Sequence, residues 1–176
     1  MGSFDVLVFN FINHGLSNPF CDFIMPLISR LGGGILYFLI GVFLLFSKKK
    51  ETKLLGVFLI AGLTISYYSV GFMKILFSRP RPFIALPNAI LLGAAEKGFS
   101  FPSNHAVISF MTAFLLASRF KMHIMLYLFA SLVAFSRVYV GVHYPSDVIS
   151  GAMIGCLIGW GLLLIWRKIE ANTPSA

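Results

Sequence analysis

The segment LLGVFLIAGLTISYYSVGFMKILF, residues 54–77, contains one charged side chain, Lys74, in an otherwise apolar run. About 20 apolar residues in a helix are enough to cross the roughly 30 Å hydrocarbon core of a bilayer, so this segment predicts a membrane-spanning helix. The whole chain has 176 residues, of which 58% are hydrophobic and 11% are charged, whereas roughly a quarter of an ordinary soluble domain is charged. The composition therefore predicts a membrane protein.

Further apolar segments stand on either side of this one, at approximately 20–46, 103–118, 122–141 and 147–166. In the first of them Pro26 and the glycines at 32–34 predict a bent or oblique span. We expect an all-α fold, a polytopic membrane helix bundle with five transmembrane helices, forming one domain over residues 1–176 with the bundle at 20–166.

Residues 1–16 precede the bundle and have a different pattern. Apolar side chains recur there at three- and four-residue intervals and are interrupted by Asp5, Asn10 and Asn13, which predicts a short helix lying in the membrane interface. If this helix crosses the bilayer instead, the bundle has six spans. A removable signal peptide carries basic residues before its apolar run. These are missing here, so no removable signal peptide is expected.

The formal charge of +8 could suggest nucleic acid as a partner, but many of the basic residues sit between apolar runs, where they determine membrane topology. With five spans these groups share one side, and the positive-inside rule makes it the cytoplasm. No nucleic-acid partner, obligatory protein partner, metal or cofactor is inferred, and Cys21 and Cys156 have no ligand or redox spacing. The groups are Lys48, Lys49, Lys50 and Lys53, then Arg119 and Lys121, then Arg167 and Lys168.

Ionisable and polar residues from three helix ends collect on the opposite side. Cations on that side run against the topology signal, so an anion should compensate them. Glu96 and Lys97 in the same region either line an entrance or are solvated, and solvation is the expected reading. The residues of this group are Lys74, Arg79, Arg81, Lys97, Ser103, His105, Arg137, His143 and Asp147.

The stretch KILFSRPRP, residues 74–82, can bring Lys74 and Arg81 to one point, because Pro80 and Pro82 hold the arginine close to the helix end. Arginine offers a planar fork of donors that matches phosphate oxygens, and lysine offers a mobile charge. The alternative is a pair of basic residues that extend to the membrane surface.

The stretch FPSNHAVISF, residues 101–110, opens the third apolar segment. Ser103 is a candidate N-cap, followed by Asn104 and His105 in the first helical turn. The free N–H groups and positive dipole end of that turn attract an anion, and His105 is placed to donate a proton to a leaving oxygen. The alternative is an ordinary capped helix.

The stretch SRVYVGVHYPSD, residues 136–147, carries Arg137, His143 and Asp147. Across the turn, Asp147 can accept the Nδ1–H of His143, so that Nε2 presents its lone pair as a nucleophile or a base. The alternative is a His–Asp pair that joins two helices.

Together the three stretches resemble the signature of the type 2 phosphatidic acid phosphatase superfamily. The matching positions are Lys74 and Arg81-Pro82, then Pro102-Ser103-Asn104-His105, then Ser136-Arg137, His143 and Asp147. The chain departs from the family where glycine usually precedes the histidine of the middle motif, because Asn104 stands there.

The resemblance implies a role for each matching residue. His143 would attack phosphorus and form a phosphohistidine, Asp147 would orient it, and His105 would protonate the leaving oxygen and later activate water. The phosphate oxygens would be held by Lys74, Arg81, Ser103, Asn104 and Arg137. No metal or other cofactor is implied.

The expected substrate is a lipid phosphate in the bilayer, because the site lies at the mouth of a membrane bundle. We expect a bacterial inner-membrane phosphatase, active at the periplasmic or external face, that hydrolyses lipid A 1-phosphate or undecaprenyl pyrophosphate. A phosphatidylglycerophosphate phosphatase is the near alternative. The signature also occurs in vanadium-dependent haloperoxidases, which are soluble, and intramembrane charges could instead mark an anion-binding or transport protein.

Overall fold

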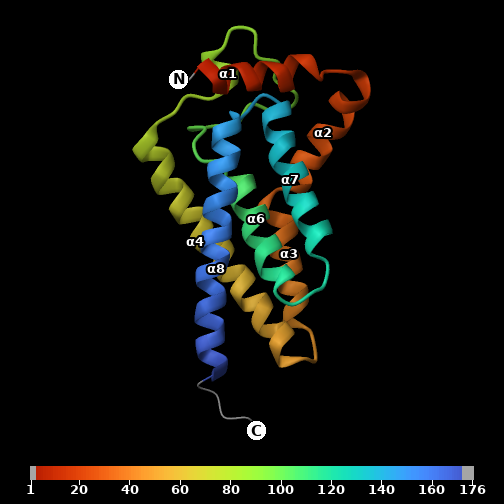
Figure 1. Cartoon of the computed structure of the whole chain (residues 1–176), viewed down its shortest axis with the longest axis vertical. Coiled ribbons are helices and arrows are strands. Elements are labelled where there is room, and N and C mark those ends of the chain that lie inside the picture. Colours follow the sequence, from red (N-terminus) through yellow and green to blue (C-terminus); the bar gives the residue numbers. More distant parts are fainter. Residues whose placement is uncertain (1–2, 172–176) are drawn as a thin grey trace.

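A computed structural model describes residues 3–171, and this part of the chain is helical without β-strands (Figure 1). Residues 1–2 and 172–176 of the expected domain lie outside the described residues. The elements are α1 (Ser3–Asn10), the π-helical turn η1 (Phe11–Gly15), α2 (Pro19–Leu31), α3 (Gly34–Leu45), α4 (Lys50–Phe77), α5 (Pro82–Ala85), α6 (Asn104–Ala117), α7 (His123–Tyr139) and α8 (Pro145–Ala171).

The helices follow the apolar segments closely. By length and composition α4 and α8 can each cross a membrane, and α2 with α3 can form one further span that bends by 46° at Gly32 and Gly33. The expected bend in the first span is therefore present. α6 and α7 are shorter apolar helices. α8 is longer than the expected 147–166 segment, because it begins at Pro145, which occupies the first helical position, and continues to Ala171.

α6 lies in the middle of the bundle and packs against α3, α4, α7 and α8. Val107, Met111 and Leu115 on this helix are completely buried. Helices around it expose large apolar side chains, among them Phe43, Ile75 and Leu157. Such a surface suits a hydrocarbon environment.

Glycine lets α8 approach the backbone of α6. A Cβ atom added at Gly155 would lie 2.3 Å from the carbonyl oxygen of Val107, and one added at Gly151 would lie 2.7 Å from that of Ser103. Small residues four apart allow this kind of close helix contact in membrane proteins. The contact brings the starts of both helices together, and the Ser103 N–H donates to the Asp147 carbonyl at 3.1 Å.

We expect Gly155→Val to destabilise the protein, because the new side chain would overlap the α6 backbone. Overpacking of this kind costs about 1–3 kcal/mol, which corresponds to a melting temperature lower by roughly 2–12 °C. Thermal unfolding in detergent measures the change. Gly161→Val on the same helix is the matched control, because a Cβ at Gly161 meets no atom within 4 Å. Equal melting temperatures for the two variants would contradict the prediction.

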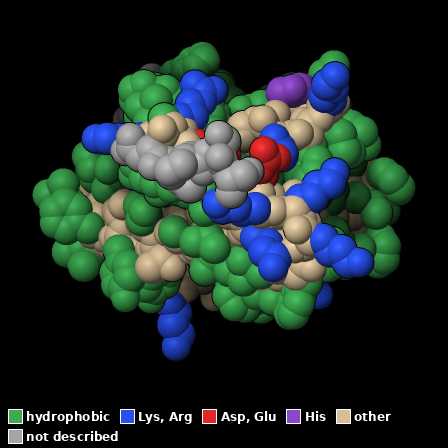
Figure 2. All heavy atoms as spheres, turned by 90° about the horizontal axis from the view of Figure 1, so that it is seen from below, with side chains coloured by type: hydrophobic (Ala, Val, Ile, Leu, Met, Phe, Trp, Pro, Cys, Tyr) green, Lys and Arg blue, Asp and Glu red, His purple; other side chains and the backbone are tan. Residues whose placement is uncertain are grey.

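The three basic groups share one end of the bundle, as the sequence predicts. The α3–α4 loop, the α6–α7 loop and the C-terminal end of α8 lie together at the bottom of Figure 1. Figure 2 shows Lys and Arg side chains gathered on this end, inside a rim of hydrophobic side chains. Arg119 there forms an ion pair with Glu51.

The opposite end carries the ionisable residues of the three motifs. α1 lies across this end, beside the segment that joins α4 to α6 and over the turn between α7 and α8 (Figure 1). His14 and His123 are exposed, as expected for surface residues.

Candidate active site

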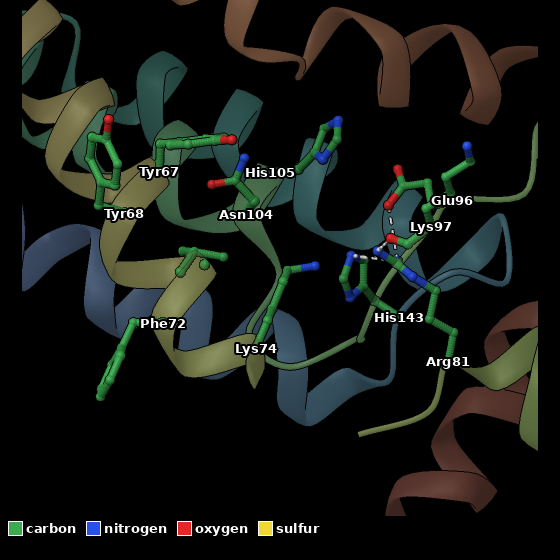
Figure 3. A pocket seen from close by; sticks show the side chains of 12 residues that line it. Tyr67, Tyr68, Phe72, Lys74, Arg81, Glu96, Lys97, Asn104, His105 and His143 are labelled. Carbon is green, nitrogen blue, oxygen red and sulfur yellow. Dashed lines mark hydrogen bonds and ion pairs between the residues drawn. The ribbon is translucent and has the colours of Figure 1, made fainter. Parts of the chain in front are cut away.

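A cavity of about 490 Å³ lies at the end of the bundle that α1 crosses (Figure 3). Its lining comes from α4, from the segment between α4 and α6, from the start of α6 and from the α7–α8 turn. The cavity brings together five of the expected site residues, which are Lys74, Arg81, Asn104, His105 and His143. Exposed aromatic side chains on α4, Tyr67, Tyr68 and Phe72, line its other part.

Arg81 is the most constrained cation of the site, with 2% of its surface exposed. Its Nε donates to the Gly98 carbonyl at 3.0 Å, and its Nη1 donates to the Val142 carbonyl at 3.0 Å. Its Nη2 donates to the Lys97 carbonyl at 3.3 Å. The guanidinium is therefore fixed by backbone acceptors inside the protein, and the interpretation of Arg81 as a residue reaching to the membrane surface is wrong.

Lys74 lies in the last turn of α4, and its Nζ donates to the Phe99 carbonyl at 2.7 Å. Its side chain extends from α4 toward the part of the cavity that holds His143 and Arg81 (Figure 3). Lysine and arginine thus reach one cavity from a helix end and from the following loop, as their spacing predicts.

The start of α6 supplies unpaired polar atoms. Ser103 occupies the N-cap position as expected, but within residues 3–171 its side chain makes no capping bond. The buried Ser103 Oγ and Asn104 Oδ1 have no hydrogen-bond partner in this part of the chain. Buried polar atoms normally have partners, so these two are available to a bound polar group. The N–H groups and dipole of the first helical turn favour an anion there.

The turn between α7 and α8 holds His143, of which 1% is exposed. Gly141 in this turn has φ +85°, and a Cβ there would lie 2.3 Å from the Ile90 carbonyl oxygen, so only glycine fits. The His143 N–H donates to the Arg137 carbonyl at 3.2 Å. This backbone bond holds the turn that carries His143 against the end of α7.

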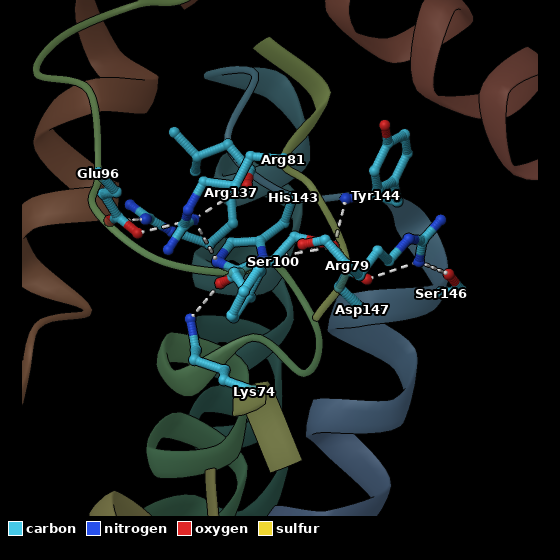
Figure 4. Close-up of polar contacts among 12 residues, drawn as sticks. Lys74, Arg79, Arg81, Glu96, Ser100, Arg137, His143, Tyr144, Ser146 and Asp147 are labelled. Atoms are coloured by element: carbon cyan, nitrogen blue, oxygen red, sulfur yellow. Dashed lines mark hydrogen bonds and ion pairs between the residues drawn. The ribbon is translucent and has the colours of Figure 1, made fainter. Parts of the chain in front are cut away.

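His143 and Asp147 face one another across this turn (Figure 4). His143 Nδ1 lies 3.4 Å from Asp147 Oδ2, which is longer than a normal hydrogen bond, and Oδ2 accepts the Tyr144 N–H at 2.9 Å. Nε2 lies 3.4 Å from Nη1 of Arg81. Burial, followed by the charges of Arg137 and Arg81, lowers the pKa of His143 well below its usual value. The imidazole is therefore neutral near pH 7 and keeps a lone pair.

Glu96 is a site residue that the sequence interpretation missed. It is not simply solvated, because its carboxylate bridges two buried arginines (Figure 4). Its Oε2 lies 2.9 Å from Arg81 Nη1, and its Oε1 forms an ion pair with Arg137. Buried cations need a partner, and Glu96 is the acidic residue in the segment 86–103. The signal that could have identified Glu96 is the expectation that an anion compensates these cations.

Arg137 does not line the first cavity. Its Nη1 donates to Ser29 Oγ, and 5% of the residue is exposed. It lines a second cavity of about 220 Å³, which shares Glu96 and His105 with the first. The sequence predicts that Arg137 holds the phosphate together with Lys74 and Arg81. In the structure, Arg137 is connected to Arg81 through Glu96.

Asp147 is completely buried, and its Oδ1 accepts a hydrogen bond from Arg79 Nη1 at 2.6 Å. Arg79 Nη2 in turn lies 2.5 Å from Asp5 Oδ2 on α1. The sequence interpretation gave no role to Arg79 and treated Asp5 as an interruption of an apolar helix. Within residues 3–171 no group of three or more His, Cys, Asp or Glu side chains is arranged to hold a metal ion.

Fold and cavity together define an all-helical protein with apolar helices of membrane length and a cationic, histidine-containing pocket at one end. Residues 55–171 match the sequence profile of the PAP2 superfamily, and the chain belongs to this family. The resemblance drawn from the three motifs is thus confirmed.

Relatives in this family have similar lengths. The chain is 31% identical to the lipid A 4'-phosphatase of Bacteroides thetaiotaomicron, across 99% of this chain and 82% of that protein. It is 32% identical to the undecaprenyl-diphosphatase of Sulfolobus acidocaldarius, across 97% and 81%. The crystal structure of Aquifex aeolicus LpxE superimposes with a TM-score of 0.79 and 33% identity, covering 92% of this chain and 96% of that one.

The ion pairs of Glu96 predict a pH-dependent contribution to stability. Burial by itself raises the pKa of Glu96, but Arg137 and Arg81 outweigh it and lower the pKa to about 2 from an ordinary 4.5. A depressed pKa stabilises the fold above about pH 4.5, and this contribution is lost as the pH falls toward 2. The difference in melting temperature between the wild type and Glu96→Gln should be constant from pH 8 to 5 and shrink below. A difference that does not change with pH would contradict the prediction.

Proposed function

We propose that this protein is a membrane lipid phosphatase that hydrolyses a phosphomonoester or pyrophosphate through a phosphohistidine. The observation that carries this proposal is the two-part character of the first cavity. One part presents a neutral histidine beside Arg81 and Lys74, and the other is lined by exposed aromatic side chains of α4. A lipid phosphate has the same division between an anionic headgroup and an apolar chain.

In the proposed mechanism His143 Nε2 attacks phosphorus in line, so that an N–P bond forms as the bond to the leaving oxygen breaks. Asp147 faces Nδ1 and stabilises the imidazolium that develops. His105, on the wall of the same cavity, donates a proton to the leaving oxygen. It then takes a proton from the water that attacks the phosphohistidine, releasing inorganic phosphate and restoring both histidines.

Arg81, Lys74 and the start of α6 would hold the phosphoryl oxygens. Asn104, whose Oδ1 is unpaired, lines the cavity, and Ser103 with its unpaired Oγ precedes it in the chain. An amide side chain can turn its N–H₂ group toward an anion. Glu96 already occupies the Arg81 guanidinium, so a phosphoryl group at that position has to displace its carboxylate. Arg137 would then lose its own partner and become available to the phosphate.

The proposed arrangement in the membrane has five spans, formed by α2 with α3, α4, α6, α7 and α8, while α1 lies in the interface. Support comes from the basic end of the bundle, which the positive-inside rule assigns to the cytoplasm. The site would then face the periplasm or exterior of a bacterial inner membrane, within a single domain. An anion transporter would instead require charges near the membrane midplane, whereas these gather at one end.

The proposed substrates are a phosphate of lipid A or undecaprenyl pyrophosphate, with phosphatidylglycerophosphate as the alternative. The names of the two relatives support the first pair. The test measures inorganic phosphate released by detergent-purified protein from phosphorylated lipid A, undecaprenyl pyrophosphate and phosphatidylglycerophosphate. Turnover of lipid A phosphate or undecaprenyl pyrophosphate above that of phosphatidylglycerophosphate is expected. Release from none of the three would overturn the proposal.

A further inference from the structure

α1 and η1 cover the active-site end through a face that holds the buried Phe9 and Asn13 and the partly buried Asp5. Phe9 is completely buried against the ring of Tyr144, the neighbour of His143. Asn13 Nδ2 donates to the carbonyls of Ile90 and Tyr139 at 2.9 and 2.7 Å. The N-terminal segment is therefore bound to the α7–α8 turn and to the segment 86–103.

Asp5 makes the contact of this segment that lies nearest to the proposed chemistry. Its Oδ2 lies 2.5 Å from Arg79 Nη2. Its Oδ1 and Oδ2 also accept the backbone N–H and the hydroxyl of Ser146, at 3.0 and 2.6 Å. Arg79 Nη1 donates to Asp147 Oδ1 at 2.6 Å and to Ser146 Oγ at 2.7 Å (Figure 4). One continuous set of charge-assisted bonds thus runs from α1 to the carboxylate that faces His143.

The contacts of Arg79 lie outside the first cavity. Arg79 does not line that cavity, but lies on the other side of Asp147, over the ring of Tyr144 at 4.0 Å. Its charge is balanced by Asp5 and Asp147. An arginine placed in this way acts on the two carboxylates and leaves the phosphate to Arg81 and Lys74.

We propose that Arg79 and Asp5 are positioning residues for the reaction and hold the Asp147 carboxylate in the orientation that aligns His143. Asp147 has two oxygens with separate tasks. Arg79 holds Oδ1, while Oδ2, which also accepts the Tyr144 N–H, lies 3.4 Å from His143 Nδ1. Asp5 fixes the other edge of the guanidinium, so α1 forms part of the active site. This inference rests on the proposed phosphatase function.

The test compares Arg79→Gln, Arg79→Lys, Asp5→Asn and the double variant Asp5→Asn/Arg79→Gln with the wild type. Asp22→Asn is the matched control, because Asp22 is an acid at the same end that accepts from Tyr139 Oη and does not contact Arg79. Steady-state kinetics on a lipid phosphate give kcat and KM separately. Thermal unfolding shows whether each variant folds.

For Arg79→Gln we expect kcat to fall by about 10–100-fold with KM within about twofold, because the loss concerns alignment in the transition state. Arg79→Lys should restore part of kcat, since one ammonium group reaches fewer acceptors. Asp5→Asn should lower kcat by roughly 3–10-fold and have no further effect in the Arg79→Gln background, because it acts through that arginine. Asp22→Asn should retain wild-type kcat.

Vanadate binding provides a measurement that does not depend on turnover. Orthovanadate resembles phosphate and can take up a fifth ligand, such as an imidazole nitrogen, so its affinity reports alignment of His143. Vanadium NMR should show binding about tenfold weaker in Arg79→Gln than in Asp22→Asn. Wild-type protein that binds vanadate but releases no phosphate from any lipid would refute the proposed function while still testing this inference.

Three results would overturn the proposed positioning role. The first is wild-type kcat and vanadate affinity in folded Arg79→Gln. The second is a change confined to KM, and the third is independent, multiplicative effects of the Asp5 and Arg79 substitutions. If Arg79→Gln does not fold, the inference is tested with Asp5→Asn, which preserves the shape of the side chain. Wild-type kcat in Asp5→Asn would also reject the inference.

Discussion

Phosphate release from the lipid substrate should fall by at least about a thousand-fold in His143→Ala, because the variant lacks the atom that forms the bond to phosphorus. Nothing else on the cavity wall replaces this nitrogen in the proposed mechanism. His105 is the other imidazole there, but its proposed task is proton transfer. The measurement is inorganic phosphate released by equal amounts of purified wild type and variant.

His14→Ala is the control for this experiment. His14 lies in η1, is exposed and makes no contact with the cavity, so its variant should keep wild-type turnover. Thermal unfolding must show that His143→Ala is folded, since the histidine is buried. Residual turnover within tenfold of the wild type, in a folded variant, would reject the covalent mechanism.

Much of the fold follows from local properties of the sequence. Segments such as 54–77 are apolar over a length that only a helix can use in a membrane, and α4 ends at Phe77 as that boundary predicts. The bend between α2 and α3 follows from glycines that weaken a helix. These signals need no knowledge of distant residues, which is why hydropathy and turn chemistry are sufficient for them.

The partners of the buried charges depend on distant parts of the chain. In the sequence Glu96 reads as a solvated loop residue, and only the fold brings it between Arg81 and Arg137. Asp5 lies far from Arg79 in sequence, and no spacing rule connects a short N-terminal helix with the end of α4. The motifs therefore predict which groups gather at one end, but not how their charges are paired.

At Ser103, in the middle motif, the sequence predicts where the helix begins but not how the side chain is hydrogen-bonded. Ser103 precedes an apolar helical run, which correctly predicts the N-cap position. The usual capping bond is not made within residues 3–171, and the buried hydroxyl stays unpaired. An unpaired group at a predicted cap indicates that another interaction, here the proposed phosphate, uses the hydroxyl.

His105→Asn should lower turnover of a lipid phosphate by about 10²–10⁴-fold, because an alkoxide leaving group needs a proton from the imidazole as it departs. The second step also loses its base. A 4-nitrophenyl phosphate gives a leaving group that needs no proton, so His143 should still be phosphorylated in the variant while hydrolysis of the phosphohistidine is slow. The two substrates therefore separate the two steps of the proposed mechanism.

When 4-nitrophenyl phosphate carries a radioactive label in its phosphate group, the phosphohistidine is measured as label retained on the denatured protein. His105→Asn should accumulate alkali-stable, acid-labile label, as a phosphohistidine does, and the double variant with His143→Ala should retain none. Equal losses of turnover on both substrates without retained label would contradict the role of His105 in protonating the leaving oxygen. His105 lines both cavities, so in the proposed mechanism one imidazole serves first the leaving oxygen and then, once the leaving group has gone, the attacking water.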